Sequence, residues 1–282
     1  MEMRKFVQLR QFKNLLLSLL PQKPNADQVK NGKRLFSSLP EVSEGSSRRR
    51  RHNDSFVVPA LSPQRISEIS TVTGVTIGIC HVSWINVSVS PAVTVLEWNA
   101  KLLPEDFRKT TNEPELLKLA YSLKNSLPES DLYVMETFSM RGKELQERVN
   151  EIHLSSMLTV LLNGADMGWM DKVYFQKQAV LNRLYGLLIG SERVSCRVIM
   201  ENLIGLTRFS EEMDSIIDKP FMNNSASIQI PPKYIDQYSD ACLEKQEDLA
   251  IALLLTLSFL DVNIFKNTAS LVRLKSRKAT SA

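Results

Sequence analysis

Short runs of apolar and β-branched residues follow one another in the first half of the chain. Val75 to Cys80, Trp84 to Val89 and Val93 to Trp98 are three such runs, and this pattern is typical of strands. Ser90-Pro91 separates the last two runs, and proline there favours a tight turn. We therefore expect three strands, of which the last two form an antiparallel hairpin.

Helical spacing becomes more frequent after this hairpin. Asn112-Glu113-Pro114-Glu115 combines an early proline with acids, which favours the start of a helix that runs to about Ser126. Leu132 to Glu136 predicts a short strand that ends on a carboxylate. The alternation predicts an α/β protein with a mixed sheet flanked by helices. The remaining expected elements are helices at about 143–163, 177–188 and 194–206, a strand at 172–175, an irregular stretch at 207–238 and a core helix over 242–260.

The first 38 residues combine apolar positions at helical spacing with eight basic and only two acidic residues. An amphipathic, basic, acid-poor leader is typical of a mitochondrial transit peptide, whereas Arg10 and Lys13 interrupt the apolar core that a secretory signal needs. Arg34-Leu35-Phe36-Ser37-Ser38 resembles the processing site of matrix presequences, and we expect cleavage after Phe36. An ordinary surface helix with a basic face is the alternative interpretation.

Charge divides the rest of the chain into three parts. Residues 53–265 hold 18 basic and 27 acidic residues, whereas Arg48 to Arg51 and the tail from residue 266 are basic. We predict a disordered presequence at 1–36, a basic linker at 37–65, a folded domain at 66–265 and a basic tail at 266–282. The candidate contacts to nucleic-acid phosphates are Arg48, Arg49, Arg50, Arg51, Lys275, Arg277 and Lys278. With only three cysteines and no CxxC pair, a disulfide framework is excluded and a reducing compartment is expected.

Acidic residues recur where nucleases of the ribonuclease-H-like class place metal ligands. Glu136 closes a strand, and Glu244 and Glu247 lie three apart at the start of the late helix, so they share one of its faces. These segments, with Gly190-Ser191-Glu192-Arg193, resemble RuvC-like Holliday-junction resolvases, whose two Mg²⁺ ions need several shared carboxylates. At the first strand Ile77-Gly78-Ile79-Cys80 stands where the resemblance implies an aspartate, and a thiol cannot replace a bridging carboxylate.

Across residues 54–265 the chain also resembles the metazoan mitochondrial transcription elongation factor, a degenerate member of the resolvase-like fold. The resemblance is carried by Thr94-Val95-Leu96-Glu97-Trp98, Asp131-Leu132-Tyr133-Val134-Met135-Glu136 and Leu187-Leu188-Ile189-Gly190-Ser191-Glu192-Arg193, in that order. It implies a homodimer in the mitochondrial matrix nucleoid that binds mitochondrial RNA polymerase and the DNA and RNA of the elongation complex. The stretch before the fold is too short for that family's helix-hairpin-helix module.

Two functions follow from these resemblances. The first is a non-catalytic elongation factor, a pseudo-nuclease without metal or cofactor in which Cys80, Glu136, Glu244 and Glu247 are vestiges of a metal site. The alternative is a mitochondrial junction resolvase that uses a divalent metal. Cys80 and His81 are adjacent in a strand and point to opposite faces, so they cannot form a nucleophile pair. Trp84 and Trp98 are expected in the hairpin or the core rather than stacked on bases.

Overall fold

The computed structural model of the protein describes residues 56–108, 112–137, 148–164, 172–189, 192–203 and 228–276. The chain divides into two compact units, Met1–His52 and Asn53–Ala282, and every described residue belongs to the second. The expected presequence with its cleavage site, the run Arg48 to Arg51, and Arg277 and Lys278 of the tail lie outside the described residues.

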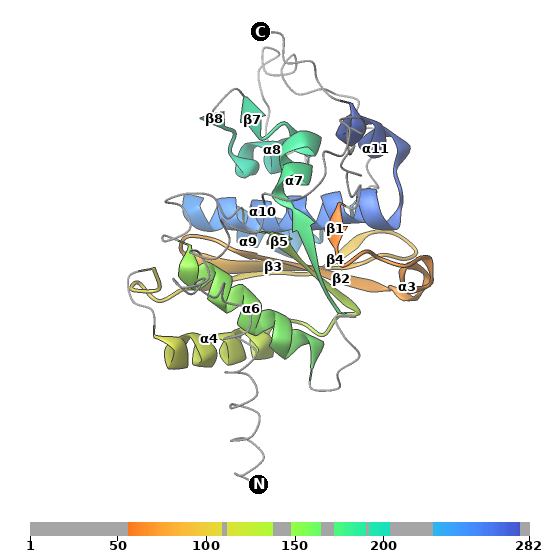
Figure 1. The fold of residues 1–282 in the computed structure, drawn as a ribbon. Helices are drawn as coiled ribbons and strands as arrows, with labels where there is room; N and C mark the ends of the chain where they lie inside the picture. Colours follow the sequence, from red (N-terminus) through yellow and green to blue (C-terminus); the bar gives the residue numbers. More distant parts are fainter. Residues whose placement is uncertain are drawn as a thin grey trace, which may run out of the picture. The chain divides into compact units, whose positions relative to one another are not determined.

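A six-stranded mixed sheet forms the centre of this second unit (Figure 1). The strand order is β1-β6-β5-β2-β3-β4. In strand β3 seven of the eight residues are buried, because helices cover both faces of the sheet. The predicted fold class, an α/β protein with a mixed sheet flanked by helices, is confirmed. The strands are β1 (Val57–Val58), β2 (Thr71–Ile77), β3 (His81–Ser88), β4 (Thr94–Leu102), β5 (Leu132–Thr137) and β6 (Val173–Lys177).

Strand direction brings several chain segments to one edge of the sheet. Strands β2, β3 and β4 form an antiparallel meander, and β3 and β4 are joined through Ser90-Pro91 as predicted. Strand β5 then runs parallel to β2, and β6 runs parallel to β5. The carboxyl ends of β2, β5 and β6 therefore share one edge, which is where open α/β sheets commonly bind ligands.

The helices form a layer on each face of the sheet (Figure 1). Helices α4 (Glu113–Ser126) and α6 (Val149–Asn163) pack together on one face. Helix α10 (Leu243–Phe259) crosses the other face and contacts β2, β3, β4 and β5. Helices α7 (Gln178–Tyr185) and α8 (Cys196–Leu203) pack against α10 on its far side.

Helix α10 is the buried core helix that its apolar sequence predicts. From Leu249 to Phe259 every residue except Ile251 is buried. The helix lies close to β2 because Gly74 has no side chain: a Cβ there would be 1.8 Å from Thr256 Oγ1 and 3.2 Å from the Ala252 carbonyl oxygen. This close approach fixes the rotation of α10 and hence the direction of the acids in its first turns.

The folded part extends beyond both domain boundaries expected from charge. Val57 is buried in β1, which pairs with β6, so the segment expected as a linker to residue 65 already contributes to the sheet. At the other end, Ser270 and Leu274 are buried beyond residue 266. The elements that the pattern did not predict are α3 (Pro63–Glu68), the hairpin β7 (Leu188–Ile189) and β8 (Glu192–Arg193), α9 (Pro232–Ser239), a π-helical turn (Leu260–Ile264) and α11 (Thr268–Lys275).

Within the described ranges no single helix is long and apolar enough to cross a bilayer. One pair, Leu243–Ile264 with Thr268–Lys275, has the necessary length and composition only when both are taken together, and it is bent by 99°.

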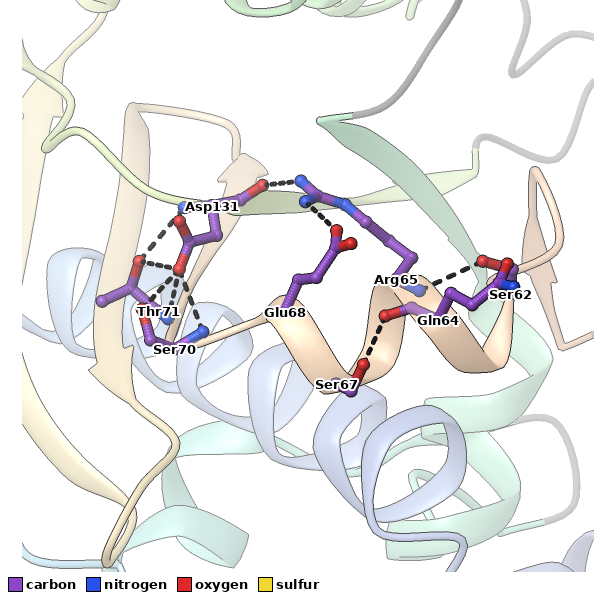
Figure 2. A network of polar contacts seen from close by, with 8 residues as sticks. All are labelled: Ser62, Gln64, Arg65, Ser67, Glu68, Ser70, Thr71 and Asp131. Carbon is purple, nitrogen blue, oxygen red and sulfur yellow. Dashed lines mark hydrogen bonds and ion pairs between the residues drawn. The ribbon is translucent and has the colours of Figure 1, made fainter.

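A polar network ties the amino ends of β2 and β5 to α3 (Figure 2). Oδ2 of Asp131 accepts hydrogen bonds from the backbone N–H and hydroxyl groups of both Ser70 and Thr71, at 2.6 to 3.1 Å. Arg65 donates to the Asp131 carbonyl oxygen at 2.7 Å and pairs with Glu68 at 3.2 Å. Although partial burial acts in the opposite direction, these hydrogen bonds lower the pKa of Asp131 to about 2.

Candidate functional site

Glu136 lies at the carboxyl end of β5, as predicted from its place after an apolar run. Glu136 and Val134 are two residues apart in β5, so their side chains point to the same face of the sheet. Gly74, which pairs with Val134 in β2, shows that α10 covers this face. The half-buried carboxyl of Glu136 is therefore directed to the layer of α7, α8 and α10. Burial raises the pKa of Glu136, while the nearby positive charges of Arg193 and Arg148 and a hydrogen bond to Gln178 act against this rise.

A second carboxylate, Glu151, reaches the same edge from α6. Only 2% of its side chain is exposed, and two arginines hold it: Arg108 through a hydrogen-bonded ion pair and Arg148 at 3.8 Å. Burial raises the pKa of Glu151, and the two guanidinium groups oppose this rise. Glu151 lies close enough to Glu136 to raise its pKa, and Arg148 acts on both acids, so the two acids and the arginines form one electrostatic group.

The third carboxylate is Asp248 in the second turn of α10. Its Oδ2 is 3.1 Å from Nδ1 of His81, the first residue of β3, and both side chains are almost fully buried. Gly78, in the turn between β2 and β3, makes room for this pair, because a Cβ there would be 2.1 Å from Asp248 Oδ1. Burial raises the pKa of Asp248 and the hydrogen bond to His81 opposes that rise.

Glu247 and Glu244, the two helix acids chosen from the sequence, do not join this group through their contacts. Glu247 caps helix α8: its oxygens accept hydrogen bonds from the Ser195 hydroxyl, from the Cys196 N–H at 2.9 Å and from the Arg197 N–H at 3.0 Å. Glu244 is exposed in the first turn of α10 and has no hydrogen bond or ion pair with the described residues. Although they are three residues apart, Glu247 thus contacts helix α8, whereas Glu244 is exposed to solvent.

Cys80 lies beyond the end of the first long strand rather than within it. Strand β2 ends at Ile77, and Cys80 is half-buried in the turn, where its carbonyl oxygen accepts the Leu103 N–H at 2.7 Å. The last residue of β2 that faces α10 is Thr76, between Gly74 and Gly78. Within the described residues its hydroxyl is buried without a hydrogen-bond partner. The first strand thus brings a neutral hydroxyl to the sheet edge.

The described residues do not fit a metal centre in this arrangement. They contain no group of three or more His, Cys, Asp or Glu side chains placed to hold a metal ion. The physical reason is that the acids already have partners: Glu247 binds the start of α8, Glu151 binds Arg108, and Asp248 binds His81. Two-metal chemistry needs carboxylate oxygens that can be shared between the ions.

The other candidate residues separate into core and surface. Trp84 donates its Nε1–H to Glu97 at 2.7 Å, and Trp98 donates to the Leu249 carbonyl oxygen at 3.1 Å. Trp98 also stacks on Tyr238, with ring centroids 5.2 Å apart. Both tryptophans are buried, as expected for hairpin or core residues. Lys275, the one phosphate-contact candidate within the described ranges, is exposed at the end of α11.

Sequence reasoning missed Glu151, Asp248 and His81. Asp248 directly follows Glu247, so the acidic start of α10 indicated that a carboxylate could face the sheet. The sequence does not give the rotation of the helix, which decides which of the two acids does so. Glu151 lies in the helix expected at 143–163, yet its partner Arg108 is 43 residues away. His81 and Asp248 are 167 residues apart, and no local pattern joins them.

Comparison with solved structures returns Holliday junction resolvases. A yeast mitochondrial resolvase, Ydc2, is 16% identical with a TM-score of 0.49, covering 75% of this chain and 85% of its own. RuvC of T. thermophilus in complex with a Holliday junction is 13% identical with a TM-score of 0.38, covering 70% and 96%. Fowlpox virus resolvase is 14% identical with a TM-score of 0.35, covering 68% and 97%. No family model and no curated protein matches.

These comparisons correct one prediction. The chain was expected to be a pseudo-nuclease without enzymatic activity, but the solved structures that it resembles are junction resolvases, which contradicts that expectation. None of these three structures is an elongation factor. The resemblance concerns the RuvC-like arrangement of sheet and helices.

Proposed function

We propose that the protein is a nuclease of the junction-resolvase class that acts on four-way DNA junctions in mitochondria. One observation carries the proposal: Glu136 closes strand β5 and Asp248 lies against Gly78 just beyond the end of β2. Glu151 of α6 interacts electrostatically with both, and burial raises the pKa of all three. Carboxyl groups with perturbed pKa values at such an edge are typical of functional sites.

Arginines around these acids supply the contacts that a phosphodiester needs. Arg108, Arg148 and Arg193 all act on Glu136 or Glu151, and Arg193 lies exposed in the β7–β8 hairpin. Guanidinium groups bind phosphate oxygens in a fixed, often bidentate geometry. The acidic body would otherwise repel DNA, so this local group of cations places the phosphate backbone next to the carboxyl groups.

The mitochondrial location rests on the basic, acid-poor leader. One of the similar solved structures is a yeast mitochondrial resolvase. A mitochondrial resolvase would meet branched intermediates of mitochondrial DNA, and a homodimer would allow two strands of one junction to be cut together.

Cleavage of a synthetic four-way junction tests the proposal directly. The purified chain without its leader is incubated with labelled junction DNA in Mg²⁺ or Mn²⁺, and product formation is followed over time. Glu136→Gln should lower the cleavage rate at least ~100-fold, because it removes a carboxyl group from the centre.

Glu115→Gln is a matched control, since Glu115 is exposed on α4 and belongs to the layer beyond the sheet. It should cut like the wild type. A wild-type protein that binds the junction but yields no product with either metal would overturn the nuclease proposal. Retention of mitochondrial RNA polymerase by that inactive protein would then favour the elongation factor instead.

A further inference from the structure

His81 and Asp248 form a hydrogen-bonded pair at the end of the sheet where the carboxyl groups converge. Nδ1 of His81 lies 3.1 Å from Asp248 Oδ2, and 9% and 10% of the two side chains are exposed. A histidine that donates its Nδ1–H to a carboxylate is held in one tautomer, and its Nε2 keeps a lone pair. Among the described residues Nε2 has no hydrogen-bond partner.

The surrounding backbone is shaped for this pair. Gly78 donates its N–H to the carbonyl oxygen of His81 at 2.8 Å, which closes the turn between β2 and β3. The same glycine leaves space for the Asp248 carboxylate, whose Oδ1 and Oδ2 would lie 2.1 and 2.7 Å from a Cβ at this position. Any larger residue would push the carboxylate away from the imidazole.

Two hydroxyl groups lie on the same sheet face beside the pair. Thr76 and Ser83 are directly opposite each other in β2 and β3, and alternation along the strands places them on the face of Gly78 and His81. Both hydroxyls are buried without a partner in the described part of the chain. Buried polar atoms of this kind are usually satisfied by ordered water, so water has partners next to the imidazole.

The pair also borders the proposed site and the protein surface. Asp248 acts electrostatically on Glu151, and Glu247 and Arg108 act on Asp248. On the outer side, Leu102, the strand partner of His81, and Ile79 in the preceding turn are 68% and 67% exposed. His81 is thus linked to the carboxyl groups through Asp248 and has exposed residues beside it in the chain and in the sheet.

We propose that His81, oriented by Asp248, is the general base of the cleavage reaction. This inference rests on the proposed nuclease function and explains how a site whose carboxylates do not fit a metal centre activates its nucleophile. Nε2 accepts a proton from a water molecule as the water oxygen bonds to phosphorus and the bridging P–O bond breaks. The leaving oxygen takes a proton from solvent, and His81 later releases its own proton to solvent.

Single-turnover cleavage of the four-way junction, measured from pH 5.5 to 9, separates this role from a structural one. His81→Gln should lower the rate constant ~100-fold or more, while the Kd for the junction stays within about twofold, since no phosphate contact is lost. The rising limb of the wild-type pH–rate profile should disappear in the variant. Added imidazole should restore part of the rate to His81→Gly.

His153→Gln is the matched histidine control, because His153 is half-buried on α6 and takes no part in the pair. It should cut at the wild-type rate. If the wild type cuts and His81→Gln cuts equally fast with the same pH profile, the general-base role is wrong while the nuclease proposal stands. If the wild type does not cut at all, the nuclease proposal itself fails.

Nitrogen NMR of the histidine side chains provides a readout that does not depend on turnover. The wild-type spectrum should show His81 with its proton on Nδ1, and Asp248→Asn should abolish that fixed tautomer. Binding of junction DNA should shift the Nε2 resonance of His81 but not that of His153. A proton on Nε2 in the free protein, or no response to DNA, would overturn the proposal.

Discussion

The two ends of strand β5 carry carboxyl groups in opposite surroundings. At the amino end, four donor groups of Ser70 and Thr71 surround the Asp131 carboxylate and lower its pKa to about 2 (Figure 2). At the carboxyl end, burial raises the pKa of Glu136. Hydrogen-bond donors to a charged carboxylate stabilise the fold, whereas a buried acid with a raised pKa costs stability at neutral pH. Such acids are common at functional sites.

The same contrast extends to the residues around each end. The Asp131 network joins α3, β2 and β5 through uncharged donors and one arginine. Around Glu136 the groups are mostly ionic, with Glu151 held between Arg108 and Arg148. We therefore interpret the amino end as structural, and the arginines at the carboxyl end as the phosphate contacts of the proposed function.

The largest effect on stability is expected at the amino end. Asp131→Asn keeps the shape of the side chain but removes its charge, so hydrogen bonds to a charged acceptor are weakened and the free energy of unfolding should fall by about 1–2 kcal/mol. Urea denaturation followed by circular dichroism measures this. Glu129→Gln, a neighbouring exposed acid, should change little. An unchanged midpoint for Asp131→Asn would show that the network is not stabilising.

The carboxyl end should respond in the opposite direction. Glu136→Gln removes a half-buried charge, so at pH 7.5 the free energy of unfolding should stay the same or rise by up to about 1 kcal/mol. The same denaturation measurement checks it. A loss comparable to that of Asp131→Asn would place Glu136 among the structural residues and remove the contrast.

The pH dependence of stability should also differ between the two ends. Asp131 has a lowered pKa in the fold, so its contribution is present above pH ~4 and is lost as the pH falls towards about 2. Because this carboxyl is largely open to solvent, the size is expected to be about 1 kcal/mol. Glu136 has a raised pKa, so its contribution is largest at low pH and declines as the pH rises. In Asp131→Asn and in Glu136→Gln, the plot of unfolding free energy against pH should lack the slope that the replaced acid contributes.

The smallest expected effect is the loss of one donor. Ser70→Ala removes the hydroxyl that is 2.6 Å from the Asp131 carboxylate but leaves the backbone N–H. The remaining donors keep the carboxylate satisfied, so a loss of about 0.5–1 kcal/mol is expected in thermal unfolding. Ser67→Ala on α3, which removes only a hydrogen bond to the Gln64 carbonyl oxygen, is the control. Equal shifts in both variants would contradict a special role for Asp131.

The sequence predicts the sheet better than the site. Strands β3, β4 and β5 could be found because their β-branched and apolar runs are local and lie between turn residues. Glu136 could be placed because a strand end fixes the position of its last residue. Glu247 and Asp248 are adjacent, however, and only the close packing of α10 on Gly74 and Gly78 decides which carboxylate faces the sheet.

The site residues that the sequence did not indicate have partners far away in the chain. Glu151 becomes part of the site through Arg108, and Asp248 through His81, and such pairings depend on the folded chain rather than on local spacing. The segment that forms helix α11 was expected to be a basic tail outside the folded domain, because of its positive charge. One face of the helix nevertheless buries Leu274. Charge alone gives no information about a single buried face.

The rate of four-way-junction cleavage tests the central claim, that the carboxyl end of β5 is the functional end, most directly. Wild type, Glu136→Gln and Asp131→Asn are compared at the same concentration of folded protein. We predict product from the wild type and from Asp131→Asn, and a rate at least ~100-fold lower for Glu136→Gln. Equal cleavage by wild type and Glu136→Gln would contradict the claim.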